Sequence, residues 1–277
     1  MTETYIPNQY LFVYGLRYQD EPFHISHYLC IESCFQVNRP GRILFFYEYE
    51  PWGPWWELAK HRLTLIHIKT NLRSYGIRYG WRNRGCRRYQ YAHIADFVRL
   101  EKLLEFGGIY ADIDTLFVHP LPEALWVKPF VLGREDDVIC QTTGLKLHSL
   151  CNAFIMSTPN AEFAQRWLEA MPKAFDGSWS NHSTLLPQRL SQEIPHALHI
   201  EQSRTFYPYM WTQKDLYTLL EGFQQDTTGI SSIQLWSHLW WASNRTDFSN
   251  FHNGLMTESH IRQVDTTYNL LARPFLP

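Results

Sequence analysis

Two aspartates, two positions apart, carry the strongest chemical signal in the chain. Asp112 and Asp114 follow Gly107, Gly108 and a short apolar run. Residues i and i+2 of an extended strand point to the same side, so we expect both carboxylates to face one ligand. Mg²⁺ and Mn²⁺ prefer oxygen ligands, and proteins commonly hold them with one or two carboxylates plus substrate phosphates. The pair therefore predicts a Mn²⁺ or Mg²⁺ site that binds a diphosphate.

The stretch before this pair adds a second candidate group. Asp96 and Arg99 are spaced i, i+3 in a predicted helix, so they share one helix face. Two interpretations stay open, an ordinary ion pair within the helix or a pair that reaches toward the ligand. His93, one turn earlier, is more typical of a packing histidine.

The pattern around these residues predicts an α/β fold, because short β-like runs alternate with helix-like stretches. The clearest helix has one broad apolar face and ends at Gly107, a normal C-terminal cap. Ligands of open α/β sheets bind at the carboxyl ends of strands, where the aspartate pair is expected. We expect strands at 10–14, 42–47, 63–68, 109–114, 129–133, 152–157 and 232–236, and helices at 24–37, 54–61, 89–106, 161–171, 183–193 and 215–223.

Composition narrows the class of protein. A chain of 277 residues with 45% apolar residues can form one large domain with a substantial core. The net charge of −2 gives no overall positive potential that would attract nucleic acid, so no nucleic-acid partner is expected. One basic cluster is either a solvated loop or a patch for an anionic acceptor or lipid phosphates. Its members are Arg78, Arg82, Arg84, Arg87 and Arg88.

The cysteines and the apolar runs bear on location. The five cysteines include no C-x-x-C pair, which favours a reducing compartment over a zinc site or a disulfide framework. No apolar run approaches about 18 residues, and no secretion leader is recognised. We therefore expect a cytoplasmic protein without a transmembrane segment, and the basic cluster leaves a peripheral contact with the inner face of a membrane open.

Two motifs resemble the signature of a known enzyme family. The helix motif A-x-x-A-D-x-x-R covers residues 92–99, and the motif G-G-I-Y-x-D-x-D covers residues 107–114. Together they resemble the Asp-x-Asp sugar-binding-region glycosyltransferases, which include the family 32 mannosyl- and galactosyltransferase-like enzymes and, more distantly, the glucosylating clostridial toxins. Matching flanks extend the resemblance over about residues 6–245.

The resemblance implies a fold and a reaction. The fold would be a single Rossmann-like GT-A domain over residues 1–277, with a mostly parallel central sheet flanked by helices. Its donor-binding part would cover about 6–135 and its acceptor-side part about 136–277. The reaction would be metal-dependent, retaining hexosyl transfer from a nucleotide-sugar, with a UDP-sugar favoured over GDP-mannose. The acceptor would be a glycan, a lipid-linked sugar or another hydroxyl, as in polysaccharide biosynthesis.

Two other functions compete with a transferase. One is a non-catalytic nucleotide-sugar- or glycan-binding protein that keeps the fold, which the retained aspartate pair argues against. The other is a metal-dependent phosphodiesterase or nucleotidase, but the chain shows no His/Asp cluster that would hold two metals.

The resemblance also implies the residues of the site. The catalytic set would be Asp112, Asp114, Asp96 and Arg99. The donor-binding set would be Tyr14, Asp96, Arg99, Gly108, Tyr110, Asp112, Asn152, His182 and Ser183. The metal ligands would be Asp114 and Asp112, completed by His238 in the favoured register or Gln234 in the alternative. Two mechanisms stay open: a front-face route needs no protein nucleophile, whereas a double-displacement route does. No such role is given to Glu135, Asp136, Asp137 or Asn152, and the Glu-Asp-Asp run is more typical of a solvated loop.

Overall fold

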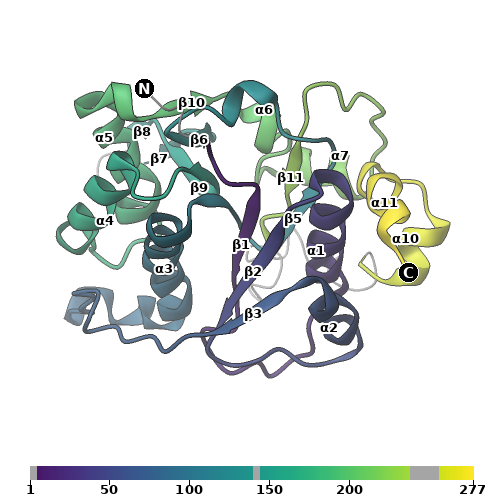
Figure 1. The fold of residues 1–277 in the computed structure, drawn as a ribbon, viewed down its shortest axis with the longest axis horizontal. Helices are drawn as coiled ribbons and strands as arrows, with labels where there is room; N and C mark the ends of the chain where they lie inside the picture. Colours follow the sequence, from purple (N-terminus) through teal and green to yellow (C-terminus); the bar gives the residue numbers. More distant parts are fainter. Residues whose placement is uncertain (1–4, 140–143, 238–255) are drawn as a thin grey trace.

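A mostly parallel β-sheet between two layers of helices forms the body of the protein (Figure 1). The computed structural model describes residues 5–139, 144–237 and 256–277. The sheet has seven strands in the order β10-β6-β9-β4-β1-β2-β3. β9 runs antiparallel to β4 and β6, and the remaining pairs are parallel. The strands are β1 (Gln9–Val13), β2 (Arg42–Tyr47), β3 (Thr64–His67), β4 (Gly108–Ala111), β6 (Phe130–Arg134), β9 (Leu150–Ser157) and β10 (His199–Glu201).

Alternating residues of the central strands form two cores, one on each face of the sheet. From β1, Tyr10 and Phe12 pack into one core, whereas Leu11 and Val13 pack into the other. Figure 1 shows the two helical layers that cover these cores. The first contains α1 (Ile25–Asn38) and α2 (Pro54–Ala59), and the second contains α3 (Gln90–Phe106), α4 (Glu162–Ala174) and α5 (Leu186–Glu193). Burial on both faces explains why these strands read as continuous apolar runs.

Smaller elements complete the described structure. Two short antiparallel pairs join β5 (Thr115–Phe117) to β11 (Ser232–Gln234) and β7 (Val138–Ile139) to β8 (Lys146–Leu147). The further α-helices are α6 (Ser203–Phe206), α7 (Gln213–Leu220), α10 (Glu258–Gln263) and α11 (Thr267–Ala272). The 3₁₀ turns are η1 (Lys60–Arg62), η2 (Trp81–Tyr89), η3 (Glu123–Leu125), η5 (Pro195–Ala197) and η6 (Arg273–Phe275), and η4 (Asn181–Leu185) is a π turn. None of the helices in the described ranges is long and apolar enough to cross a membrane.

The predicted α/β class with a mostly parallel sheet is confirmed, and several element boundaries are corrected. The helix expected at 183–193 begins only at Leu186, because the preceding residues form the π turn. The strand expected at 232–236 ends at Gln234, because Trp236 has a φ of 54° that no strand accommodates. The short β10, α6, α10 and α11 were not predicted, since helices and strands of this length depend on tertiary packing. The division near residue 135 stays a prediction.

Gly108 starts β4 where the sheet has no room for a side chain. Its φ is +102°, and a Cβ atom there would lie 2.5 Å from the carbonyl oxygen of Gln9. We predict that Gly108→Ala lowers the free energy of unfolding by about 2 kcal/mol more than Gly144→Ala, because it adds overpacking to backbone strain. Gly144 is the matched control, with φ of +70° and no described atom within 4 Å of its Cβ position. Urea denaturation tests this, and equal losses in the two variants would contradict it.

Candidate functional site

The two aspartates lie in a turn that follows β4 rather than within a strand. β4 ends at Ala111, and the backbone N–H of Thr115 donates to the carbonyl of Asp112 at 3.1 Å. The chain turns here because Thr115 begins β5, which pairs with β11 outside the main sheet. The expectation that strand geometry aims both carboxylates to one side is therefore wrong. Each carboxylate has its own environment.

Asp112 occupies the more open position. Its side chain is 30% exposed, and its Oδ1 accepts from the Tyr110 hydroxyl at 2.6 Å and pairs with Arg99 Nη1 at 3.2 Å. No described residue donates to the other oxygen, Oδ2. Burial raises the pKa of Asp112 to about 6; Arg99 opposes this rise and the charge of Asp114 adds to it. One carboxylate oxygen is thus held by the protein and the other is left for a ligand.

Asp114 is buried and its hydrogen bonds are made within the protein. Its Oδ1 accepts from the Gln234 amide nitrogen at 2.6 Å, and its Oδ2 accepts from both the backbone N–H and the hydroxyl of Ser237 at 2.7 Å. The Gln234 oxygen in turn accepts from the Thr115 hydroxyl at 2.9 Å. Asp114 therefore joins the ends of β5 and β11. His238, the favoured third metal ligand, lies outside the described residues.

A buried guanidinium joins the groups on the other side of Asp112. Arg99 Nη2 lies 3.1 Å from Asp96 Oδ1, and Nη1 donates to the backbone carbonyl of Asn152 at 2.6 Å. Its guanidinium carbon lies 4.5 Å from the centre of the Tyr110 ring. Asp96 and Arg99 are thus an ion pair within the helix and also part of a larger cluster that includes Asp112.

Asp96 is the most completely held carboxylate of the cluster. Its Oδ1 accepts from the Asn152 amide at 2.7 Å as well as from Arg99, and its Oδ2 pairs with His182 Nε2 at 2.9 Å. Burial by itself would raise the pKa of Asp96, but Arg99 and His182 together hold that pKa below its usual value. The group is therefore an anion at neutral pH.

A β-bulge places Asn152 in this cluster. The β6–β9 register shifts from Leu132 opposite Ile155 to Gly133 opposite Cys151, so residues 152–154 bulge away from β6, while Phe154 still pairs with Ala111 of β4. Released from β6, the Asn152 carbonyl accepts from Arg99, and the Ala153 carbonyl extends the pairing with β4 by accepting from the Asp112 backbone N–H at 2.8 Å. Bulges commonly re-aim side chains beside functional sites.

The structure brings together most of the predicted donor-binding residues, but not all of them. Asp96, Arg99, Tyr110, Asp112, Asn152 and His182 form the one hydrogen-bonded cluster described above. Gly108 lies at the opposite end of β4 from Asp112. Tyr14 follows β1, where its ring packs against Phe23 and His27, and burial raises its pKa to about 12. Ser183 is buried in the π turn and donates to the Trp179 carbonyl at 2.5 Å. That the predicted residues contact the nucleotide-sugar donor stays a prediction.

Sequence reasoning missed two polar groups. Ser237 donates two hydrogen bonds to Asp114, and its one signal in the sequence was its position next to His238, the expected metal ligand. Glu135, expected in a solvated acidic loop, is buried and accepts from the Ser149 hydroxyl, whereas Asp136 and Asp137 are exposed. Burial raises the pKa of Glu135 to about 6, although hydrogen bonds from Ser149, Cys151 and Thr184 oppose the rise. Its position directly after β6, at a carboxyl strand end, was the available signal.

The residues fit a divalent cation of the hard, oxygen-binding kind. Asp112 Oδ2 has no donor from the described residues, and Asp114 Oδ1 accepts one hydrogen bond. A carboxylate oxygen has about two acceptor positions, so both aspartates retain capacity for a metal. No group of three or more His, Cys, Asp or Glu side chains suited to a metal occurs among the described residues. A two-carboxylate site completed by substrate phosphates is the usual arrangement for Mg²⁺.

Because Asp114 satisfies buried donors, its removal should weaken the fold. We predict that Asp114→Ala lowers the free energy of unfolding by about 2–4 kcal/mol, since it leaves the Gln234 amide and Ser237 donors unpaired. Asp136→Ala, which removes an exposed carboxylate, is the control and should change stability by less than about 0.5 kcal/mol. Chemical denaturation without metal measures both. Equal, small changes would contradict the structural role of Asp114.

Asp112 should affect stability in the opposite direction, and only at higher pH. Its folded pKa of about 6 lies above the usual pKa of 3.8 for an aspartate, so the folded state binds the proton more tightly. Ionisation of Asp112 therefore costs stability as pH rises through 4 to 6. We predict that Asp112→Asn stabilises the metal-free protein by about 1–3 kcal/mol at pH 7.5 and has little effect at pH 4. Thermal unfolding in EDTA tests this; destabilisation at pH 7.5 would contradict it.

Comparisons with known proteins identify the family. The family model of the glycosyltransferase sugar-binding region containing the DXD motif matches residues 26–136. Glucan organizing enzyme 1 of Cryptococcus neoformans var. grubii serotype A (strain H99) is 32% identical over 279 residues, which covers 98% of this chain and 71% of the relative.

Likeness to solved structures is weaker. The galactosyltransferase LgtC in complex with donor and acceptor sugar analogues has 13% identity and a TM-score of 0.49, covering 96% of this chain and 95% of that one. The PaToxG glycosyltransferase has 17% identity and a TM-score of 0.44, covering 69% and 71%. The assignment therefore rests on the sequence, and the α/β architecture agrees with the GT-A fold that the family resemblance implies. This chain belongs to the glycosyltransferases with an Asp-x-Asp sugar-binding region.

Proposed function

We propose that the protein is a metal-dependent, retaining hexosyltransferase that uses a nucleotide-sugar donor, with a UDP-sugar favoured over GDP-mannose. The proposal rests chiefly on Asp112, whose two carboxylate oxygens have different surroundings. One of its oxygens is fixed by Tyr110 and Arg99, and the other has no donor from the described residues. A carboxylate with a raised pKa at the end of a strand is well suited to receive a cation with its diphosphate.

The residues of the cluster would divide the work of donor binding. Asp112 and Asp114 would hold Mn²⁺ or Mg²⁺, which when bound neutralises the diphosphate leaving group. Asp96 has three protein donors for about four acceptor positions, so one position is left for a hydroxyl of the donor sugar. Arg99 donates mainly to protein groups, so it would act chiefly by orienting Asp96 and Asp112.

The transfer step needs no protein base in the proposed front-face route. The bond between the anomeric carbon and the diphosphate oxygen breaks, and its electron pair stays with the leaving diphosphate. The acceptor hydroxyl oxygen bonds to the same face of the anomeric carbon, and its proton passes to the departing phosphate oxygen. Fixed donors and cations beside the leaving group supply the stabilisation.

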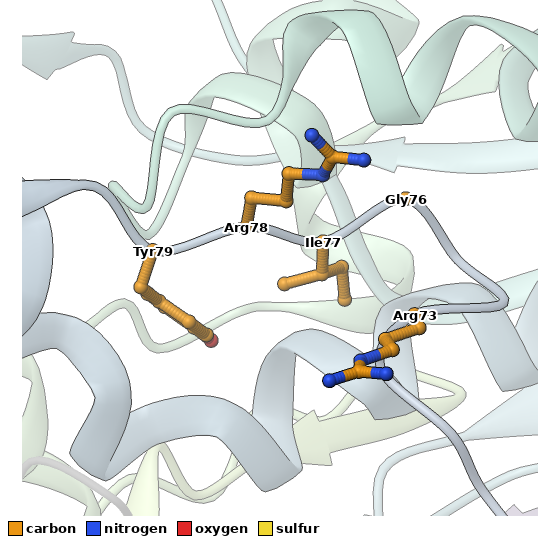
Figure 2. A pocket seen from close by; sticks show the side chains of 5 residues that line it. All are labelled: Arg73, Gly76, Ile77, Arg78 and Tyr79. Atoms are coloured by element: carbon orange, nitrogen blue, oxygen red, sulfur yellow. The ribbon is translucent and has the colours of Figure 1, made fainter.

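An exposed arginine surface supports an anionic or lipid-linked acceptor. Residues 70–95 contain no Asp or Glu. The ion pairs of the described residues include none of Arg73, Arg78, Arg84, Arg87 and Arg88. Figure 2 shows Arg78 and Tyr79 extending to opposite sides of this loop, next to a shallow pocket that Arg73, Gly76 and Ile77 also line. The exposed members of the arginine surface are Arg73, Arg78, Arg84, Arg87 and Arg88. We propose a peripheral contact with an anionic membrane; a cytoplasmic location stays a prediction.

The donor and the metal requirement are tested together. We predict slow nucleotide release, dependent on Mn²⁺, from one of UDP-glucose, UDP-galactose, UDP-N-acetylglucosamine, UDP-N-acetylgalactosamine and GDP-mannose, and faster release once an acceptor is added. Both EDTA and Asp112→Asn should reduce the release at least about 100-fold. Asp112→Asn is the better variant, because loss of activity in Asp114→Ala also follows from lost stability.

Three other outcomes would contradict the proposed function or its metal site. Fast release without acceptor would indicate a hydrolase. Binding of a donor without release would indicate a non-catalytic binding protein. Full activity of Asp112→Asn would contradict the metal site.

The arginine surface makes its own prediction. We expect Arg84→Glu/Arg87→Glu/Arg88→Glu to lose about 100-fold in binding to vesicles of phosphatidylcholine with phosphatidylglycerol, because each basic side chain near such a surface contributes about 1 kcal/mol. Donor hydrolysis should be unchanged. Arg166→Glu, an exposed change on α4, is the control. Vesicle sedimentation measures the effect, and equal binding by all three proteins would contradict the membrane contact.

A further inference from the structure

We propose that His182 is a positioning residue for Asp96, supported by His93 and Tyr79 behind it; the proposal rests on the proposed function. The side chain of His182 is 0% exposed, and its Nε2 lies 2.9 Å from Asp96 Oδ2. A ring so completely buried reaches the donor site only through the carboxylate that it touches. Asp96 would then bind the sugar in the orientation that His182 imposes.

The hydrogen bond to Asp96 fixes which ring nitrogen carries a proton. An ionised carboxylate can only accept, so Nε2 of His182 is protonated and donates to Asp96 Oδ2. No described residue is a hydrogen-bond partner of the buried Nδ1 atom of His182, so the hydrogen bond of this ring within the described residues goes to Asp96. The ring adds a third donor to a carboxylate that already accepts from Asn152 and Arg99.

A second histidine supports the first without adding charge. The His93 and His182 rings are perpendicular, with centroids 5.3 Å apart, and His93 Nδ1 lies 2.7 Å from the Tyr79 hydroxyl. Burial lowers the pKa of His93 to about 4; Asp96 opposes this and His182 adds to it. His93 is therefore neutral at pH 7 and does not compete with Arg99 as a cation beside Asp96.

The backbone that carries His182 departs from a regular α-helix. The N–H groups of Thr184 and Leu185 both donate to the Ser180 carbonyl, at 3.0 and 2.9 Å, which widens the helix by one residue into a π turn. The His182 carbonyl accepts from the Trp167 indole at 2.9 Å. Single π turns occur frequently at functional sites, where they change the direction of a side chain.

The role predicts a loss that is specific to the sugar. In His182→Ala, Asp96 loses the donor on Oδ2 and is free to turn, so the donor KM should rise and kcat should fall, each about 10–100-fold as for other supporting residues. The affinity for UDP with Mn²⁺, measured by calorimetry, should stay within about 2-fold, because UDP lacks the sugar.

Two variants separate positioning from packing. His182→Gln keeps an N–H close to the place of Nε2 and should recover most of the lost activity. Phe175→Leu loosens the packing of both histidines, whose ring centroids lie 5.0 and 5.2 Å from Phe175, but keeps the hydrogen bond, so it should have little effect. Equal losses in Phe175→Leu and His182→Ala, or loss of UDP binding together with sugar binding, would overturn the proposal.

A measurement without substrate separates this proposal from the proposed function. Long-range ¹H–¹⁵N NMR correlations should show a proton on Nε2 of His182 at pH 7, and Asp96→Asn should shift that signal. Observation of the Nδ1–H tautomer, which has no proton on Nε2, would overturn the positioning role. Wild-type silence toward every donor would instead count against the transferase.

Discussion

The buried guanidinium of Arg99, between Asp96 and Asp112, is the interaction on which the rest of the site depends. Two carboxylates at the end of a buried strand repel each other and resist ionisation unless a cation and hydrogen-bond donors compensate them. Arg99 supplies that compensation from α3, and the bulge in β9 adds the Asn152 amide as a donor to Asp96 and the Asn152 carbonyl as an acceptor that orients Arg99. A helix, a strand end and a bulge thus converge on one cation.

The two aspartates of the motif have different roles because they have different surroundings. Asp114 is surrounded by donors from Gln234 and Ser237, so it ties the turn after β4 to β11. Asp112 is held on one side only and is 30% exposed. The inner carboxylate stabilises the turn that presents the outer one, so one motif combines a structural role with the proposed role in binding.

Sequence patterns were sufficient for the main strands and helices, but insufficient for the short elements and for the local geometry of the site. The apolar residues located β1, β2 and α3 nearly to the residue. A strand that is buried on both faces is a continuous apolar run, and a helix that is buried on one face has a clear apolar period. The turn at Asp112, the bulge at Asn152 and the π turn at His182 depend on contacts between distant segments, which local patterns do not record. Glu135 was misjudged because its acidic neighbours are solvated while it is buried. The ion pair of Asp96 with Arg99 was visible from spacing, whereas their common partner Asn152 was implied only by the family resemblance.

A crystal structure with UDP and Mn²⁺, recorded at a wavelength where manganese scatters anomalously, tests the central claim most directly. The account predicts one manganese peak within coordination distance of Asp112 Oδ2, with Arg99 and Tyr110 still on Oδ1 and a phosphate oxygen of UDP on the metal. A manganese ion bound away from Asp112, or one that takes Asp112 only after Arg99 has left it, would contradict the account.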